Sequence, residues 1–223
     1  MREEPKKAKI GFLLLGGILV AAIALLFFGW LAEEVLEADT QRFDTLLRTA
    51  IHRLASPPIT SVMELISLLG SVGVLVALSL LTISLFYYLH RPRAATLLAT
   101  TMAGVAVLDL VLKDAFHRVR PLAFFGTSPS SYSFPSGHAL ASLCFYGALA
   151  AILSARIAGR QARLCIWTIA VLLVAMIGFS RVYLGVHYPS DVIAGYCAAI
   201  VWVAAVGFLD RILRRQPNKK RNV

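Results

Sequence analysis

An all-α integral membrane protein is the fold class that this sequence predicts, and two observations carry the prediction. The chain of 223 residues is 58% apolar, with a mean hydropathy of +0.75, whereas soluble domains are about 45–50% apolar. Charged residues make up only 15% of the chain and are bunched between long apolar runs, as in membrane-spanning chains. We therefore expect a single membrane-embedded domain over residues 1–223, with six transmembrane helices and an interfacial amphipathic helix between the first two.

Six apolar runs are close to the length that crosses a bilayer. A transmembrane helix needs about 20 residues, with a range of about 17–25, and an open sheet leaves backbone polar groups unsatisfied in lipid. The runs are too long and too uniformly apolar for barrel strands, and the first is longer than the apolar core of a cleavable signal peptide. They cover residues 10–31, 65–89, 94–112, 139–155, 164–179 and 192–209.

The distribution of basic residues predicts the orientation of these helices. Of the 22 Lys and Arg residues, 15 fall in the two terminal tails and in the loops after the second and fourth helices, and seven fall on the other side. Lys and Arg concentrate in cytoplasmic loops, so we expect cytoplasmic termini in a bacterial plasma membrane. This topological use of basic residues also accounts for the net charge of +10, so no nucleic-acid partner is expected.

The stretch between the first two runs has the pattern of an amphipathic helix. Asp39 or Thr40 is placed to cap its start, and Pro57-Pro58 is placed to end it. Such a helix is expected to lie in the outer membrane interface, although packing over the helix bundle fits the pattern equally well. The apolar positions are Phe43, Leu46, Leu47, Ala50, Ile51 and Leu54, and much of the other face is occupied by Arg42, Asp44, Arg48 and Arg53.

Three short polar motifs interrupt the apolar sequence. They read K-x6-RP at residues 113–121, PSGH at residues 135–138, and SR-x5-H-x3-D at residues 180–191. The first two fall between the third and fourth helices, and the last falls between the fifth and sixth. The predicted orientation therefore brings all three motifs to the outer face of the membrane.

The cations Lys113, Arg120 and Arg181 suit a phosphoryl group. In phosphoryl transfer, negative charge spreads over three equatorial oxygens, and catalysis is mostly positioning and charge stabilisation. Arginine offers a planar fork for two phosphate oxygens, and lysine offers a point charge. Taken alone, each of these residues is more simply an interfacial cation whose stem lies along the lipid, and Arg118 keeps that interpretation.

The PSGH motif predicts a helix start that binds an anion. Ser136 is a favoured capping residue, and Gly137 lets a ligand approach the backbone closely. Unpaired N–H groups and the helix dipole favour negative charge at such a start, and simple capping by Ser136 is compatible with that role. His138 then lies in the first turn, where it could protonate a departing alkoxide as a general acid.

His187 and Asp191 are four residues apart, and Pro189 favours a helix start between them. The carboxylate can then accept from the imidazole Nδ1–H, which leaves Nε2 free as a nucleophile. As isolated residues they are more simply an interfacial histidine and a helix N-terminal acid. Asp109 is one turn before Lys113 and is expected to pair with that lysine. His117 has no assigned role.

In this order and spacing, the three motifs resemble the signature of the type 2 phosphatidic acid phosphatase (PAP2) superfamily, in its membrane lipid phosphatase branch. All three match in full, and the six-helix layout extends the resemblance over nearly the whole chain. The resemblance implies a metal-independent phosphatase without a cofactor, in which His187 attacks phosphorus, Asp191 orients His187 and His138 protonates the leaving group. It also implies that the phosphate is held by Lys113, Arg120, Ser136, Gly137 and Arg181.

The activity that the resemblance implies is hydrolysis of a lipid phosphate or diphosphate at the outer face. Phosphatidylglycerophosphate, phosphatidic acid and undecaprenyl diphosphate are the candidate substrates, and substrate and membrane lipids are the expected partners. A lipid phosphotransferase would use the same phosphohistidine, so the motifs do not separate the two activities. A non-catalytic lipid-binding or transport protein is a further alternative, but it would not need both histidines and the aspartate. The oligomeric state is not predicted.

Overall fold

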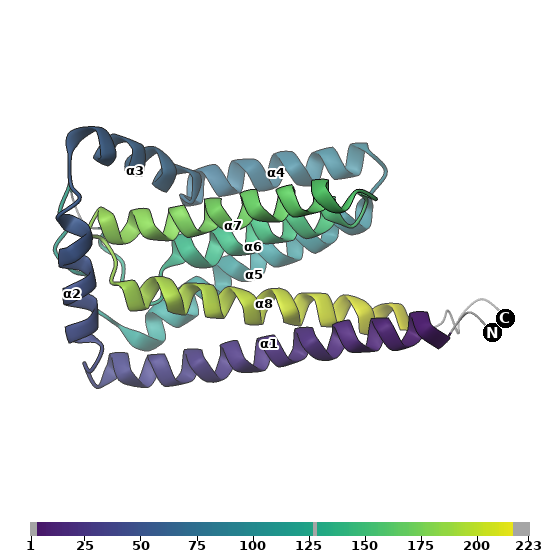
Figure 1. Cartoon of the computed structure of the whole chain (residues 1–223), viewed down its shortest axis with the longest axis horizontal. Coiled ribbons are helices and arrows are strands. Elements are labelled where there is room, and N and C mark those ends of the chain that lie inside the picture. The colour runs from purple at the N-terminus through teal and green to yellow at the C-terminus, as the bar shows by residue number, and fades with distance from the viewer. Residues whose placement is uncertain (1–3, 127–128, 216–223) are drawn as a thin grey trace.

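The computed structural model describes residues 4–126 and 129–215, and within these ranges the chain forms eight helices and no strand. The topology is a bundle of long helices with one short helix across its end (Figure 1). The helices are α1 (Glu4–Leu36), α2 (Gln41–His52), α3 (Pro57–Leu69), α4 (Val72–Tyr88), α5 (Pro92–Phe116), α6 (Gly137–Ser154), α7 (Arg160–Tyr183) and α8 (Pro189–Arg215).

Among the described residues, five helices are long and apolar enough to cross a membrane, namely α1, α5, α6, α7 and α8. The predicted continuous helix over residues 65–89 is wrong, because the chain bends by 46° between α3 and α4. Gly70 ends α3, and the Ser71 hydroxyl accepts from the backbone N–H of Val74 and caps α4. The bent pair can count as one span, so six crossings stay a prediction.

Helix α2 presents its apolar side outward. Phe43, Leu46 and Leu47 are exposed, whereas Asp44, predicted on the polar face, is completely buried. Figure 1 shows α2 lying across the end of the bundle, between the end of α1 and the start of α3. An apolar side that faces away from the protein suits a helix at a membrane surface, and this location stays a prediction.

Both predicted boundary signals of α2 act differently in the structure. Thr40 is the residue before the helix, but its side chain makes no capping bond. Its hydroxyl accepts from Arg118 Nη2 at 3.2 Å instead. Pro57 does not end α2, which already stops at His52, but starts α3, because proline suits the first turn of a helix.

The buried interior brings α6 and α8 together, and α5 packs against them. Leu140 and Cys144 of α6 pack with Ala198 and Ala199 of α8 and with Val105 of α5. Small residues on α8 allow this close approach between helices, as is usual in membranes. One end of the bundle then collects the end of α5, the start of α6, the end of α7 and the start of α8 (Figure 1).

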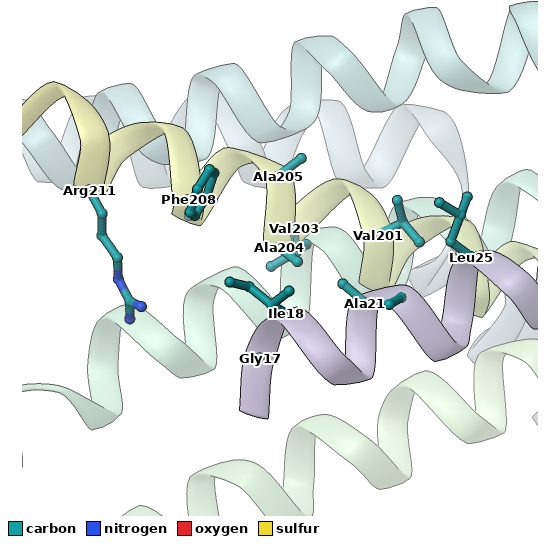
Figure 2. Close-up of a pocket in the computed structure, with 12 residues that line it drawn as sticks. Gly17, Ile18, Ala21, Leu25, Val201, Val203, Ala204, Ala205, Phe208 and Arg211 are labelled. Atoms are coloured by element: carbon teal, nitrogen blue, oxygen red, sulfur yellow. The ribbon is translucent and has the colours of Figure 1, made fainter. Parts of the chain in front are cut away.

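A separate cavity lies between α1 and α8. It has a volume of about 570 Å³ and contains none of the predicted site residues. Figure 2 shows Gly17 and Ala21 of α1 near Ala204 of α8, with Arg211 at one end. The three motifs meet instead at a smaller cavity at one end of the bundle.

Candidate active site

A cavity of about 280 Å³ is lined by residues of all three motifs. Its polar lining includes Lys113, Arg120, Gly137, His138, Arg181 and His187. Its apolar lining comes mainly from α4 and α5 and includes Val72, Leu75, Val76, Met102, Val105 and Ala106. Both histidines thus face one space, as groups that flank a single phosphate must. Ser136 and Asp191 lie directly behind this lining and are completely buried.

The two cations of the first motif are held on separate partners. Lys113 Nζ donates to Asp109 Oδ2 at 2.7 Å, which confirms the predicted pair. Arg120 Nε donates to the carbonyl of Ser131 at 2.7 Å, and its Nη1 donates to the carbonyl of Val186 at 2.8 Å. Burial lowers the pKa of Arg120, and the Asp191 and Asp109 carboxylates oppose that shift. Arg120 is therefore fixed between the loop before α6 and the loop before α8.

The second motif starts α6 as predicted, but Ser136 is not a conventional cap. Its side chain makes no capping bond, and its hydroxyl is buried without a hydrogen-bond partner among the described residues. The backbone N–H of Ser136 donates to the carbonyl of Asp191 at 2.9 Å, which joins the starts of α6 and α8. His138 follows and lines the same cavity as the cations Lys113, Arg120 and Arg181.

His187 is held by a partner on each ring nitrogen. Nδ1 lies 3.3 Å from Asp191 Oδ2, and Nε2 lies 2.9 Å from Arg120 Nη1. Because a guanidinium only donates, Nε2 must accept, and the ring proton is on Nδ1 facing the carboxylate. Burial lowers the pKa of His187 to about 4, an effect that Asp191 opposes and that Arg120 and Arg181 reinforce. The side chain is therefore neutral near pH 7, with its Nε2 lone pair toward the cavity cations.

The turn that presents His187 depends on Gly185. This residue has φ +76°, and an added Cβ would meet the backbone N of Phe124 at 2.6 Å. Glycine adopts such a conformation without the steric cost that other residues incur. Phe124 N–H in turn donates to the carbonyl of Leu184 at 3.1 Å, so the loop after the first motif is bound to the third.

Arg181 completes the cationic lining from α7. Its side chain is only 9% exposed, and Nη1 donates to the Ser67 hydroxyl on α3. Its Nε is buried without a partner among the described residues. The Arg181 side chain lines the cavity, where its positive charge attracts an anion.

Two residues of the site were not predicted from the sequence, Arg118 and Asp44. The interfacial interpretation of Arg118 is wrong, because its side chain is 14% exposed and lies inside the protein. It bonds to Asp44 at 2.8 Å and also contacts Asp191. Its place two residues before Arg120 is the one available signal, and none existed for Asp44, which is far away in the chain. His117 ends α5, is exposed and packs on Tyr132.

Comparison with known protein families matches residues 94–211 to the PAP2 superfamily. The chain belongs to the PAP2 superfamily. This PAP2 chain is 28% identical over 191 residues to phosphatidylglycerophosphatase B of Bacillus subtilis (strain 168), an alignment that covers 85% of the chain and 94% of that protein. It is 31% identical over 99 residues to the undecaprenyl-diphosphatase of Sulfolobus acidocaldarius, which covers 44% of each.

A solved structure has the same fold. The PAP2-type phosphatidylglycerolphosphate phosphatase of Bacillus subtilis superposes with a TM-score of 0.80 at 27% identity, and the match covers 88% of this chain and 98% of that one. With the apolar helices, these similarities identify the PAP2 chain as a lipid phosphatase enzyme and a multi-pass membrane protein.

Proposed function

We propose that this chain hydrolyses a lipid phosphate or diphosphate through a phosphohistidine intermediate at the outer face of a bacterial plasma membrane. The observation that carries the proposal is the mixed lining of the 280 Å³ cavity. Cations, two imidazoles and the Asp109 carboxylate line it together with apolar side chains of α4 and α5. A lipid phosphate has the same combination, with a charged head and an apolar tail.

The cations have the arrangement that phosphate binding requires. Lys113, Arg120 and Arg181 come from different helices and loops but line one cavity. Their charge stabilises a phosphoryl group as its negative charge redistributes. In the absence of substrate, Lys113 is neutralised by Asp109 and Arg120 contacts His187 Nε2. A bound phosphate would take over both donors, which frees Nε2 for attack.

The first chemical step then uses both histidines. The Nε2 lone pair of His187 attacks phosphorus, and the bond from phosphorus to the leaving oxygen breaks. His138, protonated once the negative phosphate has bound among the cations, gives that oxygen its proton and becomes neutral. Asp191 accepts from Nδ1–H throughout and stabilises the positive charge that develops on the ring.

The second step releases phosphate. A water attacks phosphorus while His138, now neutral, takes its proton, and the N–P bond breaks. Inorganic phosphate leaves, and the bonding electrons return to His187 Nε2. Ser136, Gly137 and the backbone at the start of α6 are proposed to hold phosphate oxygens during both steps.

Two features support the outer face as the location of this site. The positive-inside distribution places the loops that carry the three motifs opposite the basic tails. At the same end of the bundle, α2 exposes Phe43 and Leu46, as expected for a helix at the lipid headgroup level. Phosphatidylglycerophosphate is the first substrate to test, because the relative that bears that activity in its name aligns over 94% of its length.

The test is phosphate release by the purified protein in detergent from phosphatidylglycerophosphate, phosphatidic acid and undecaprenyl diphosphate. We expect turnover of at least one, a labelled phosphoprotein on rapid acid-free quenching, and neither in His187→Ala. Turnover like that of the wild type in His187→Ala would refute the nucleophile assignment. Product analysis with an added acceptor lipid separates hydrolysis from phosphotransfer.

A further inference from the structure

A buried ionic network lies behind the cavity and links α2 to Asp191. Arg118 Nη1 donates to Asp191 Oδ1 and, at 2.8 Å, to the hydroxyl of Ser190. Arg118 Nη2 donates to Asp44 Oδ2 at 2.8 Å. Asp44 also accepts from the Ser190 backbone N–H at 2.9 Å. One guanidinium therefore bridges two carboxylates, both of which are completely buried.

The two carboxylate oxygens of Asp191 have different partners. Oδ2 faces His187 and also accepts from the Tyr188 backbone N–H and the Ser133 hydroxyl. Oδ1 is held by Arg118. A carboxylate that orients a histidine must stay ionised and keep its angle to the ring. The positive charge of the Arg118 guanidinium favours the ionised form of Asp191, and its rigid planar donors fix the orientation of the carboxylate.

Neither Arg118 nor Asp44 lines the cavity. A direct role in holding the phosphate is therefore excluded by position, as is a role in gripping the lipid tail. Asp44 instead connects α2 to Ser190 in the first turn of α8. The next residue, Asp191, carries the carboxylate that orients His187.

We propose that Arg118 and Asp44 are positioning residues for the phosphatase reaction, acting in series: Asp44 holds Arg118, and Arg118 holds Asp191 in the orientation that directs His187 Nε2 at phosphorus. The inference rests on the proposed function, since it concerns the same nucleophile. Its signature is a loss of kcat without a change of KM, because substrate contacts stay intact.

The test is a double-mutant cycle on kcat with Asp44→Asn and Arg118→Gln. We expect kcat to fall about tenfold in Asp44→Asn and about 100-fold in Arg118→Gln, by analogy with the losses of about 10- to 100-fold when a group that orients a metal-binding histidine is removed. KM should change less than about twofold. Because the residues act in series, the double variant should be no slower than Arg118→Gln alone. Asp39→Asn changes an exposed carboxylate in the turn before α2. It is the matched control, and its kcat should equal that of the wild type.

A milder variant guards against loss of folding. Thr40→Val removes only the bond from Arg118 Nη2 and should lower kcat about two- to threefold with KM unchanged. An increase in KM, multiplicative losses in the double variant, or full activity in both single variants would overturn the inference.

A readout without turnover separates this inference from the proposed function. Nitrogen NMR of labelled histidine, assigned through His187→Gln, should show the Nδ1–H tautomer in the wild type and a mixture of tautomers in Arg118→Gln. An unchanged tautomer in Arg118→Gln would overturn the positioning role. A wild type that shows the tautomer but releases no phosphate from any lipid phosphate would overturn the proposed function alone.

Discussion

Gly137→Ala tests whether backbone approach at the start of α6 sets the geometry of the phosphate site. An added Cβ would lie 2.6 Å from Asp109 Oδ1 and 3.2 Å from Lys113 Nζ. Ordinary contacts between non-bonded heavy atoms are about 3.5–4.0 Å, so the ion pair has to retreat by about 1 Å. Both side chains are mostly buried, which limits where they can go.

The magnitude follows from that displacement. A misplacement of about 1 Å at a reacting centre can lower the rate by about 100-fold, so we expect kcat/KM to fall by about 10- to 100-fold, or roughly 1.4–2.7 kcal/mol. The assay is initial-rate phosphate release in mixed micelles, with thermal unfolding measured in parallel. Gly147→Ala is the control in the same helix, because its Cβ would meet only Leu143 Cδ1 at 3.8 Å.

The cause can be assigned by removing the obstructing carboxylate. In an Asp109→Ala background, Gly137→Ala should lower kcat/KM by a smaller factor than in the wild type, because the closest clash is gone. Equal activity of Gly137→Ala and Gly147→Ala would refute the reasoning. The same holds if Gly137→Ala lowers kcat/KM by the same factor in the wild type and in Asp109→Ala.

Three further predictions concern pH, charge and the lipid tail. Since burial holds the pKa of His187 at about 4, the acidic limb of kcat/KM assigned to this group should lie near pH 4, and a limb near 6.5 would contradict the assignment. The pKa of His187 in the folded protein is below its value of about 6.5 in the unfolded chain. The free energy of unfolding is therefore unaffected by this group above pH 6.5 and falls by about 3 kcal/mol in total as the pH drops from 6.5 to 4. Thermal unfolding of His187→Gln should lack that loss. Arg181→Lys should raise KM about tenfold, since the planar fork is lost, whereas exposed Arg42→Lys should not. Met102→Trp should fill the apolar part of the cavity and slow long-chain substrates far more than a water-soluble phosphomonoester. The exposed position Val107 on the same helix provides the control, Val107→Trp, and equal effects of both substitutions would contradict the location of the tail.

The sequence was sufficient to predict most of the long helices and the cations and histidines that line the cavity. Long apolar runs have few structural alternatives in lipid, so five of the six predicted segments appear in the structure with their ends moved by up to six residues. The spacing of His187 and Asp191 placed them one helical turn apart, and the structure has the ring and carboxylate in contact. Residue type and spacing along the chain were enough for this prediction.

Contacts between distant parts of the chain could not be predicted in the same way. Asp44 looked like a solvent-exposed acid on an amphipathic helix, because nothing near it in sequence indicates the partner, Arg118. The bend at Gly70 was missed because hydropathy is continuous across it, while the helix ends at a glycine and restarts at a serine cap. Hydropathy averaged over a window does not register such a break.

The apolar lining contributed by α4 and α5 has a consequence for how this enzyme meets its substrate. A tail that stays among lipids arrives by diffusion in two dimensions, so the relevant concentration is molecules per unit of membrane area. Diluting the substrate with inert detergent at constant bulk concentration should therefore slow the reaction, and adding buffer alone should not.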